Sequence, residues 1–217
     1  KNMKNKKLRW GIVTFILGIS LVVSLFSGSQ KRVARASVET TIAIMTTADL
    51  QSCITPYTLD HNGEKITVGG LERIASAAKK VRGQVNGALL LSSGDDMIAP
   101  LFSMFHGEPE MCGMSLAGYD IVAPGNHEFD NGAQVYKNAL NFADFDVVSA
   151  NLIIKDSKLA KQIKPYVIKE ITGIKVGIFG MMTPDLLRIC KLGDDVSVDQ
   201  DIVSTAQNVV DNLISEG

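Results

Sequence analysis

The chain has 217 residues, of which 46% are hydrophobic and 21% charged, with a formal net charge of -1. This composition suffices for one domain with a real core, and it excludes a disordered tail, a collagen-like chain, a coiled coil and a disulfide scaffold. The charge is uneven, because positions 1–36 carry eight Lys or Arg and no acid. The remaining chain is therefore acidic and should repel phosphate backbones, so we expect no nucleic-acid partner.

The first 36 residues have the architecture of an export signal. A basic stretch at positions 4–9 precedes an apolar or small run from 11 to 26, and Ala34-Arg35-Ala36 offers a small-x-small cleavage site. The length of the run fits either a cleaved signal peptide or an uncleaved N-terminal membrane anchor, and the sequence leaves both open. We expect an exported protein, periplasmic, cell-envelope or extracellular, that meets a membrane only through this segment if it is uncleaved.

From residue 37 onward, short apolar runs alternate with helical patterns, which is typical of an α/β fold. We predict strands at 41–45, 88–91, 120–123 and 147–150, a hairpin of strands 166–171 and 174–179, and helices near 71–81, 133–142 and 202–214. The last helix carries an apolar stripe that needs a sheet to cover it. An α/β alternation would deliver another strand after this helix, so we expect the chain to be a fragment.

Polar residues follow three of the predicted strands, at the point where each strand ends. Asp49 and Gln51 follow the first strand, Gly94-Asp95 follows the second, and the segment 125–130 follows the third. Because ligands bind beyond the carboxyl ends of strands in an open parallel sheet, we expect the three tips to converge on one edge. Carboxylate, carboxamide and imidazole donors gathered there suit one or two divalent cations.

Simpler interpretations apply to most of these residues when each is taken alone. An Asp after a strand more often caps a turn than binds a metal, and we interpret Asp96 as a solvated neighbour. His61 and His106 lie in no such arrangement and are interpreted as surface or core residues. The segment 125–130 is more specific, because it packs an amide ligand, an imidazole and Asp130 into six residues.

Sulfur-containing side chains have packing interpretations. The cysteines are widely spaced and form no CxxC pair, so we predict packing thiols, with Cys53 buried, and leave one disulfide open. They are Cys53, Cys112 and Cys190. The methionines between the second and third predicted strands indicate adaptable packing. They are Met97, Met104, Met111 and Met114.

Together the motifs resemble those of the calcineurin-like metallophosphoesterase superfamily, and specifically its exported 5'-nucleotidase and UDP-sugar hydrolase branch. The resemblance runs from about residue 41 to 217 and rests on D-x-H at Asp49, GD at Gly94-Asp95, and GNHEFD at 125–130. Segments 148–152 and 165–185 also look like that branch. The resemblance implies an α/β, metallophosphoesterase-like layered sheet sandwich with flanking helices. Residues 37–217 would be the N-terminal, incomplete part of the catalytic domain, truncated before its last strands.

The resemblance also implies roles for individual residues. Asp49 would be a ligand of a first metal ion, Asp95 would bridge two metals, and Asn126 would be a ligand of the second. His127, held by Asp130, would act on the transferring phosphoryl group. The two divalent ions could be manganese, zinc, iron or calcium. Glu128 and Phe129 are expected to be structural.

Two departures from the family pattern qualify this expectation. Gln51 stands where the family usually has a metal-binding His, and the later His segments of the family are absent. We therefore expect these residues alone to hold metals poorly and to be inactive as a fragment.

The predicted function is metal-dependent hydrolysis of small-molecule phosphate esters, 5'-nucleotides or nucleotide sugars, by a water activated between two metals. A thiosulfate-ester substrate stays open. The alternative is an exported, non-catalytic binding module on a degenerate phosphoesterase scaffold.

Overall fold

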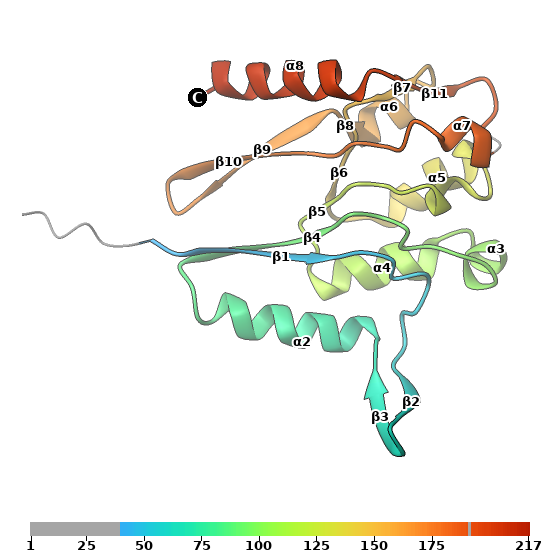
Figure 1. Ribbon diagram of the computed structural model, residues 1–217, viewed down its shortest axis with the longest axis vertical. Helices are drawn as coiled ribbons and strands as arrows, with labels where there is room; N and C mark the ends of the chain where they lie inside the picture. Colours follow the sequence, from blue (N-terminus) through green and yellow to red (C-terminus); the bar gives the residue numbers. More distant parts are fainter. Residues whose placement is uncertain (1–39, 191) are drawn as a thin grey trace, which may run out of the picture. The chain divides into compact units, whose positions relative to one another are not determined.

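The computed structural model describes residues 40–190 and 192–217, so the predicted export segment lies outside the described residues. A five-stranded parallel sheet, in the order β1-β4-β5-β6-β8, lies at the centre of the fold (Figure 1). Its strands are β1 (Ile42–Thr47), β4 (Gly87–Ser92), β5 (Ile121–Val122), β6 (Asp146–Val148) and β8 (Ile163–Lys164). Every neighbouring pair is parallel, so all carboxyl ends lie on one edge of the sheet. The predicted α/β class is confirmed.

Helices cover this sheet and connect its strands. They are α2 (Leu71–Arg82), α3 (Leu101–Phe105), α4 (Glu108–Ala117), α5 (Ala133–Ala139), α6 (Leu159–Gln162), α7 (Leu186–Ile189) and α8 (Ile202–Ser215), with 3-10 turns η1 (His127–Phe129) and η2 (Leu140–Phe142). Helix α2 contacts β1, β4 and α4. Its apolar face buries Leu71 and Ala78 in one cluster with Leu90 of β4 and Met114 of α4. This packing holds the first two strand ends in place.

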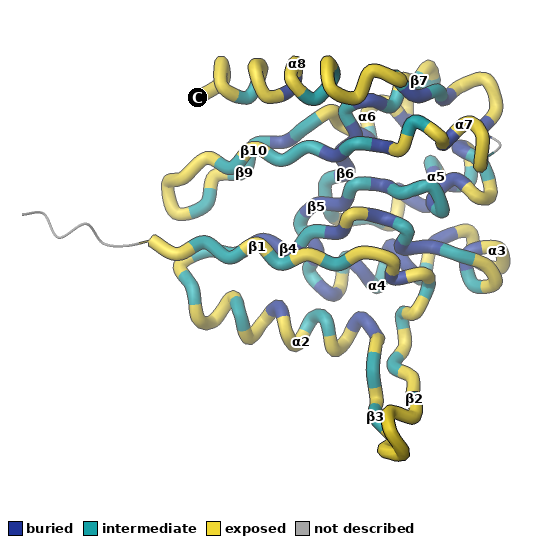
Figure 2. The backbone as a smooth tube through the Cα atoms, viewed as in Figure 1, coloured by how far each residue is buried: buried dark blue, intermediate teal, exposed yellow. Residues whose placement is uncertain are grey.

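Pairs of antiparallel strands lie outside the central sheet. They are β2 (Tyr57–His61) with β3 (Glu64–Val68), β7 (Leu152–Ile154) with β11 (Val196–Val198), and β9 (Tyr166–Ile171) with β10 (Ile174–Phe179). The β9–β10 hairpin was predicted with the same bounds. The β2–β3 hairpin was not predicted, and it is largely exposed (Figure 2). Its Asn62-Gly63 turn, with φ of 55° and 85°, is a strong sequence signal for such a hairpin.

Only part of the apolar stripe of helix α8 is covered by the rest of the structure. Val209 is buried, and Leu213 packs so closely on β10 that a Cβ at Gly177 would lie 2.9 Å from Leu213 Cδ2. Val203 and Ile214 on the other flank are 76% and 73% exposed. Within the described residues, β10 reaches one side of the helix, and the other side of the predicted apolar stripe stays exposed.

The sulfur-containing residues divide between core and surface. Met97, Met111 and Met114 are buried as predicted, whereas Met104 is 68% exposed on the short helix α3. Cys53 is exposed, so its predicted burial was wrong. All three cysteines are free thiols within the described residues. In the same part of the chain, the model has no helix whose length and hydropathy would suit a bilayer crossing.

Asp146 ties the sheet to the β9–β10 hairpin. Its two carboxylate oxygens each accept a 2.6 Å hydrogen bond, from Lys164 and Lys169. Burial alone would raise the pKa of Asp146, but the two ammonium groups outweigh burial and lower it. A lowered carboxyl pKa stabilises the fold above the pKa of the unfolded chain, and this contribution disappears as the pH falls through the folded value.

We therefore expect Asp146→Asn to lower the free energy of unfolding by about 1 kcal/mol at pH 7, since all three groups are partly exposed. The deficit should shrink below about pH 4, where the wild-type carboxylate also becomes protonated. Urea unfolding at both pH values measures the difference. Asp144→Asn, an exposed neighbour, is the control, and an equal deficit at both pH values would contradict the ion-pair account.

Candidate functional site

The loops after β1 and β4 are joined by backbone hydrogen bonds beyond the ends of the strands. The amides of Asp49, Gln51 and Ser52 donate to the carbonyl oxygens of residues 94, 95 and 96 at 2.9, 3.0 and 2.8 Å. Leu50 is buried in the core beneath this loop, while its neighbours Asp49 and Gln51 are exposed. The loop is thus anchored by one apolar side chain and presents the polar side chains on either side of it.

The loop after β4 packs equally closely on the loop after β5. A Cβ at Gly94 would lie 2.1 Å from Gly125 N, and a Cβ at Gly125 would lie 2.2 Å from Asp95 Oδ1. The amide of His127 donates to Asp95 Oδ1 at 3.0 Å. These contacts confirm that the three tips converge, and they explain the two glycines, because any side chain would push the loops apart.

Three of the four candidate metal ligands lie on strained backbone. Asp49, Gln51 and Asp95 have φ values of 53°, 47° and 55°, in the left-handed region that non-glycine residues rarely adopt. Each such residue costs about 1–3 kcal/mol, and the cost persists only where surrounding contacts enforce it. Strain at three candidate ligands favours a functional role for these turns.

Glu128 holds the second and third loops together. Its carboxylate is fully buried and accepts hydrogen bonds from the amides of Gly125 at 2.6 Å, Asp96 at 2.7 Å, Asp95 at 3.1 Å and Met97 at 3.4 Å. Burial raises the pKa of Glu128 to about 7, and the charge of Asp96 adds to the increase. The structural role predicted for Glu128 is confirmed by these contacts.

Asp96 differs from its predicted state. It is buried rather than solvated, with Oδ2 accepting a 2.7 Å hydrogen bond from Ser92 Oγ and Oδ1 without a hydrogen-bond partner in the described structure. Burial raises the pKa of Asp96 to about 6; the hydrogen bond from Ser92 opposes the increase, and the charges of Asp95 and Asp49 contribute to it. The interpretation as a solvated neighbour was wrong because the amide of Asp96 is held by Glu128, which turns the residue inward.

His127 and Asp130 form the predicted pair. Nδ1 of the imidazole lies 2.7 Å from Asp130 Oδ2, and the imidazole side chain is 29% exposed. The hydrogen bond to Asp130 raises the pKa of His127, because the carboxylate stabilises the imidazolium. With Nδ1 engaged, Nε2 remains for contact with a ligand. Phe129 between them is fully buried, with its ring centroid 5.1 Å from that of Tyr136, so η1 is fixed from beneath.

The available donors match a divalent cation in chemistry. Asp49, Asp95 and Asn126 offer carboxylate and amide oxygens, and Gln51 offers a further amide oxygen. Among residues 40–190 and 192–217, no group of three or more His, Cys, Asp or Glu side chains is arranged to hold a metal ion. The three loops converge in the structure, whereas the roles of these residues as metal ligands stay predictions.

Cys190 was missed as a residue of this region. Its thiol donates to the carbonyl oxygen of Asn126 at 3.3 Å, and burial followed by the charge of Asp130 raises its pKa. No spacing signal in the sequence links it to the third loop.

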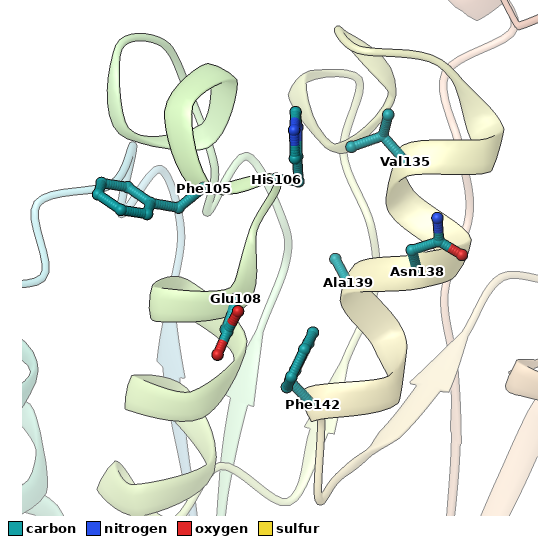
Figure 3. A pocket seen from close by; sticks show the side chains of 7 residues that line it. All are labelled: Phe105, His106, Glu108, Val135, Asn138, Ala139 and Phe142. Atoms are coloured by element: carbon teal, nitrogen blue, oxygen red, sulfur yellow. The ribbon is translucent and has the colours of Figure 1, made fainter.

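His61 and His106 lie outside the three loops. His61 pairs with Asn62 at the exposed β2–β3 turn. His106 lines a cavity of about 370 Å³ between the α3–α4 segment and α5, to which no candidate ligand contributes (Figure 3).

Comparisons with known proteins show similarity to nucleotidases and phosphoesterases. Protein UshA of Yersinia enterocolitica is 32% identical over 142 residues, which cover 61% of this chain and 26% of UshA. The 5'-nucleotidase precursor of Thermus thermophilus superposes with a TM-score of 0.75 at 32% identity, over 80% of this chain and 34% of that one. The calcineurin-like phosphoesterase YfkN of Bacillus subtilis gives a TM-score of 0.62 at 28% identity, over 80% and 58%. No protein-family model matches the chain.

The fold and the three loops are similar to those of a calcineurin-like phosphoesterase and of 5'-nucleotidases. Within it, the resemblance to the 5'-nucleotidase branch is confirmed by the relatives and the solved structures. The chain spans about a quarter of the length of the first curated relative and about a third of the Thermus structure. The similarity is therefore established for the matched quarter to third of those proteins and not for their full length.

Removing the Glu128 carboxylate should separate the loops. We expect Glu128→Gln to lower the free energy of unfolding by about 3 kcal/mol, because its NH2 group would face amide donors in a buried site. Urea unfolding measures this, with Glu64→Gln on the exposed β2–β3 hairpin as the matched control. A loss below about 1 kcal/mol would show that the loops do not depend on Glu128.

The raised pKa of His127 depends on Asp130. In metal-free protein, Asp130→Asn should return the His127 pKa towards the ordinary value of about 6.5, so that the imidazole loses its proton at lower pH. Titration of the imidazole signals by NMR measures this, with Asp211→Asn on α8 as the control. An unchanged His127 pKa in Asp130→Asn would rule out the pairing.

Proposed function

We propose that the protein is part of an exported, metal-dependent phosphoesterase that hydrolyses small-molecule phosphate esters, 5'-nucleotides or nucleotide sugars. The observation that carries this proposal is the convergence of the Asp49, Asp95 and Asn126 loops beside the His127–Asp130 pair. The 5'-nucleotidase precursor of Thermus thermophilus supports the substrate class. The export-signal pattern of residues 1–36 supports a periplasmic, envelope or extracellular location.

The proposed metal ligands are the residues that match the family's motifs, one or two on each loop. Asp49 and Gln51 would hold a first divalent ion, Asn126 a second, and Asp95 would lie between the two. Two bound ions, manganese, zinc, iron or calcium, would polarise the phosphoryl group and activate the attacking water. The half-buried position of Asp95 and Asn126 and the exposure of Asp49 agree with a site that opens towards solvent.

His127 would act on the leaving group. Asp130 engages Nδ1 and raises the pKa of His127, which favours the imidazolium form with a proton on Nε2. From there the imidazolium would stabilise the charge of the transferring phosphoryl group and protonate the departing oxygen. Because η1 is anchored by Phe129, this geometry would need no rearrangement of the loop.

The test is Mn²⁺-dependent release of phosphate from 5'-AMP by the full-length protein. Asp95→Asn should reduce turnover by at least about a hundredfold, because a bridging carboxylate would serve both ions. Asp211→Asn, an exposed carboxylate on α8, should leave turnover unchanged.

Mn²⁺ binding without turnover on 5'-AMP or a nucleotide sugar would favour another ester substrate. A protein that binds no Mn²⁺ would favour the non-catalytic binding module. Full turnover in Asp95→Asn would contradict the assigned roles.

A further inference from the structure

The strained loop after β1 has a second attachment, through Ser52. Ser52 has a left-handed φ of 55° directly after the strained Gln51. Its Oγ accepts the amide of Ile98 at 2.8 Å, and its hydroxyl has two acceptors, Ile98 O at 2.9 Å and Glu110 Oε1 at 2.6 Å. A hydroxyl has one proton, so it donates to one acceptor at a time, and the shorter contact is to Glu110.

Glu110 is unusual in its surroundings. It lies on α4 with no exposed surface, and its second oxygen, Oε2, has no hydrogen-bond partner in the described structure. Within residues 40–190 and 192–217, no Lys, Arg or His forms an ion pair with it. Ser52 is thus the side chain that Glu110 contacts by a hydrogen bond.

Stability alone gives no reason for a carboxyl group at this position. Burying a carboxyl with one hydrogen bond and one unpaired oxygen costs free energy, and an apolar side chain of similar volume is commonly neutral or stabilising there. Removing Glu110 would not orphan the Ser52 hydroxyl, because Ile98 O is already within reach. The carboxyl group is therefore best explained by what it does to the loop.

We infer that Glu110 is a positioning residue that acts through Ser52 to fix the loop 49–52, and so orients the oxygens of Asp49 and Gln51 towards the first metal ion. This inference rests on the proposed function. The contact fixes the loop to helix α4, whereas the backbone hydrogen bonds fix it to the neighbouring loop. Two independent attachments are what a strained turn requires to keep one conformation.

The experiment compares metal affinity with folding stability in the full-length protein. Mn²⁺ binding is measured by calorimetry and unfolding by urea with EDTA. The variants are Glu110→Met, which removes the acceptor, Glu110→Gln, which keeps an acceptor oxygen for Ser52, and Ser52→Ala. Glu108→Gln, an exposed residue on the same helix, is the control.

We expect Glu110→Met to weaken Mn²⁺ binding at least tenfold while the metal-free protein keeps or gains stability. Glu110→Gln should stay within threefold of the wild type. In the Ser52→Ala background, Glu110→Met should cause no further loss of affinity, because the effect passes through Ser52.

Other results would overturn the inference. Unchanged affinity in Glu110→Met, or a loss of affinity matched by a loss of metal-free stability, would leave Glu110 without a positioning role, while turnover on 5'-AMP in the wild type would keep the proposed function intact. A wild-type protein that binds no Mn²⁺ would overturn both.

Discussion

The buried carboxylate of Glu128 is the interaction on which the candidate site depends. It accepts hydrogen bonds from backbone amides of both the second and the third loop, so one side chain joins the two turns. A buried carboxyl group is tolerated when backbone donors surround it, and the donors in turn are fixed by it. The positions of Asp95 and His127 relative to one another are also fixed directly, because the amide of His127 donates to Asp95 Oδ1.

The rest of the fold brings the loops close to the Glu128 carboxylate. Parallel strands place every tip on one edge, and Gly94 and Gly125 allow backbones to approach where a Cβ would clash. The buried Leu50 and the strained turns at Asp49 and Gln51 then fix the first loop. Holding polar groups close together at the edge of the sheet costs folding free energy, and the stable sheet offsets this cost. Enzymes commonly preorganise a site in this way.

Much of this was predictable from local patterns. The apolar runs that form β1 and β4 and the GNHEFD segment predicted the sheet and the meeting of its tips. The sequence did not predict that Asp96 and Glu110 are buried or that Cys53 is exposed, because burial of a short or polar side chain is decided by tertiary contacts. Asn62-Gly63 did carry a local signal for the β2–β3 hairpin, which an analysis of turn chemistry would have found.

We propose that the three loops together bind two divalent ions. Crystals of the full-length protein soaked in Mn²⁺ test it most directly, by anomalous diffraction. We expect two anomalous peaks bridged by the Asp95 carboxylate, one also beside Asp49 and the other also beside Asn126. Peaks elsewhere, or none at these loops while Mn²⁺-dependent turnover persists, would contradict it.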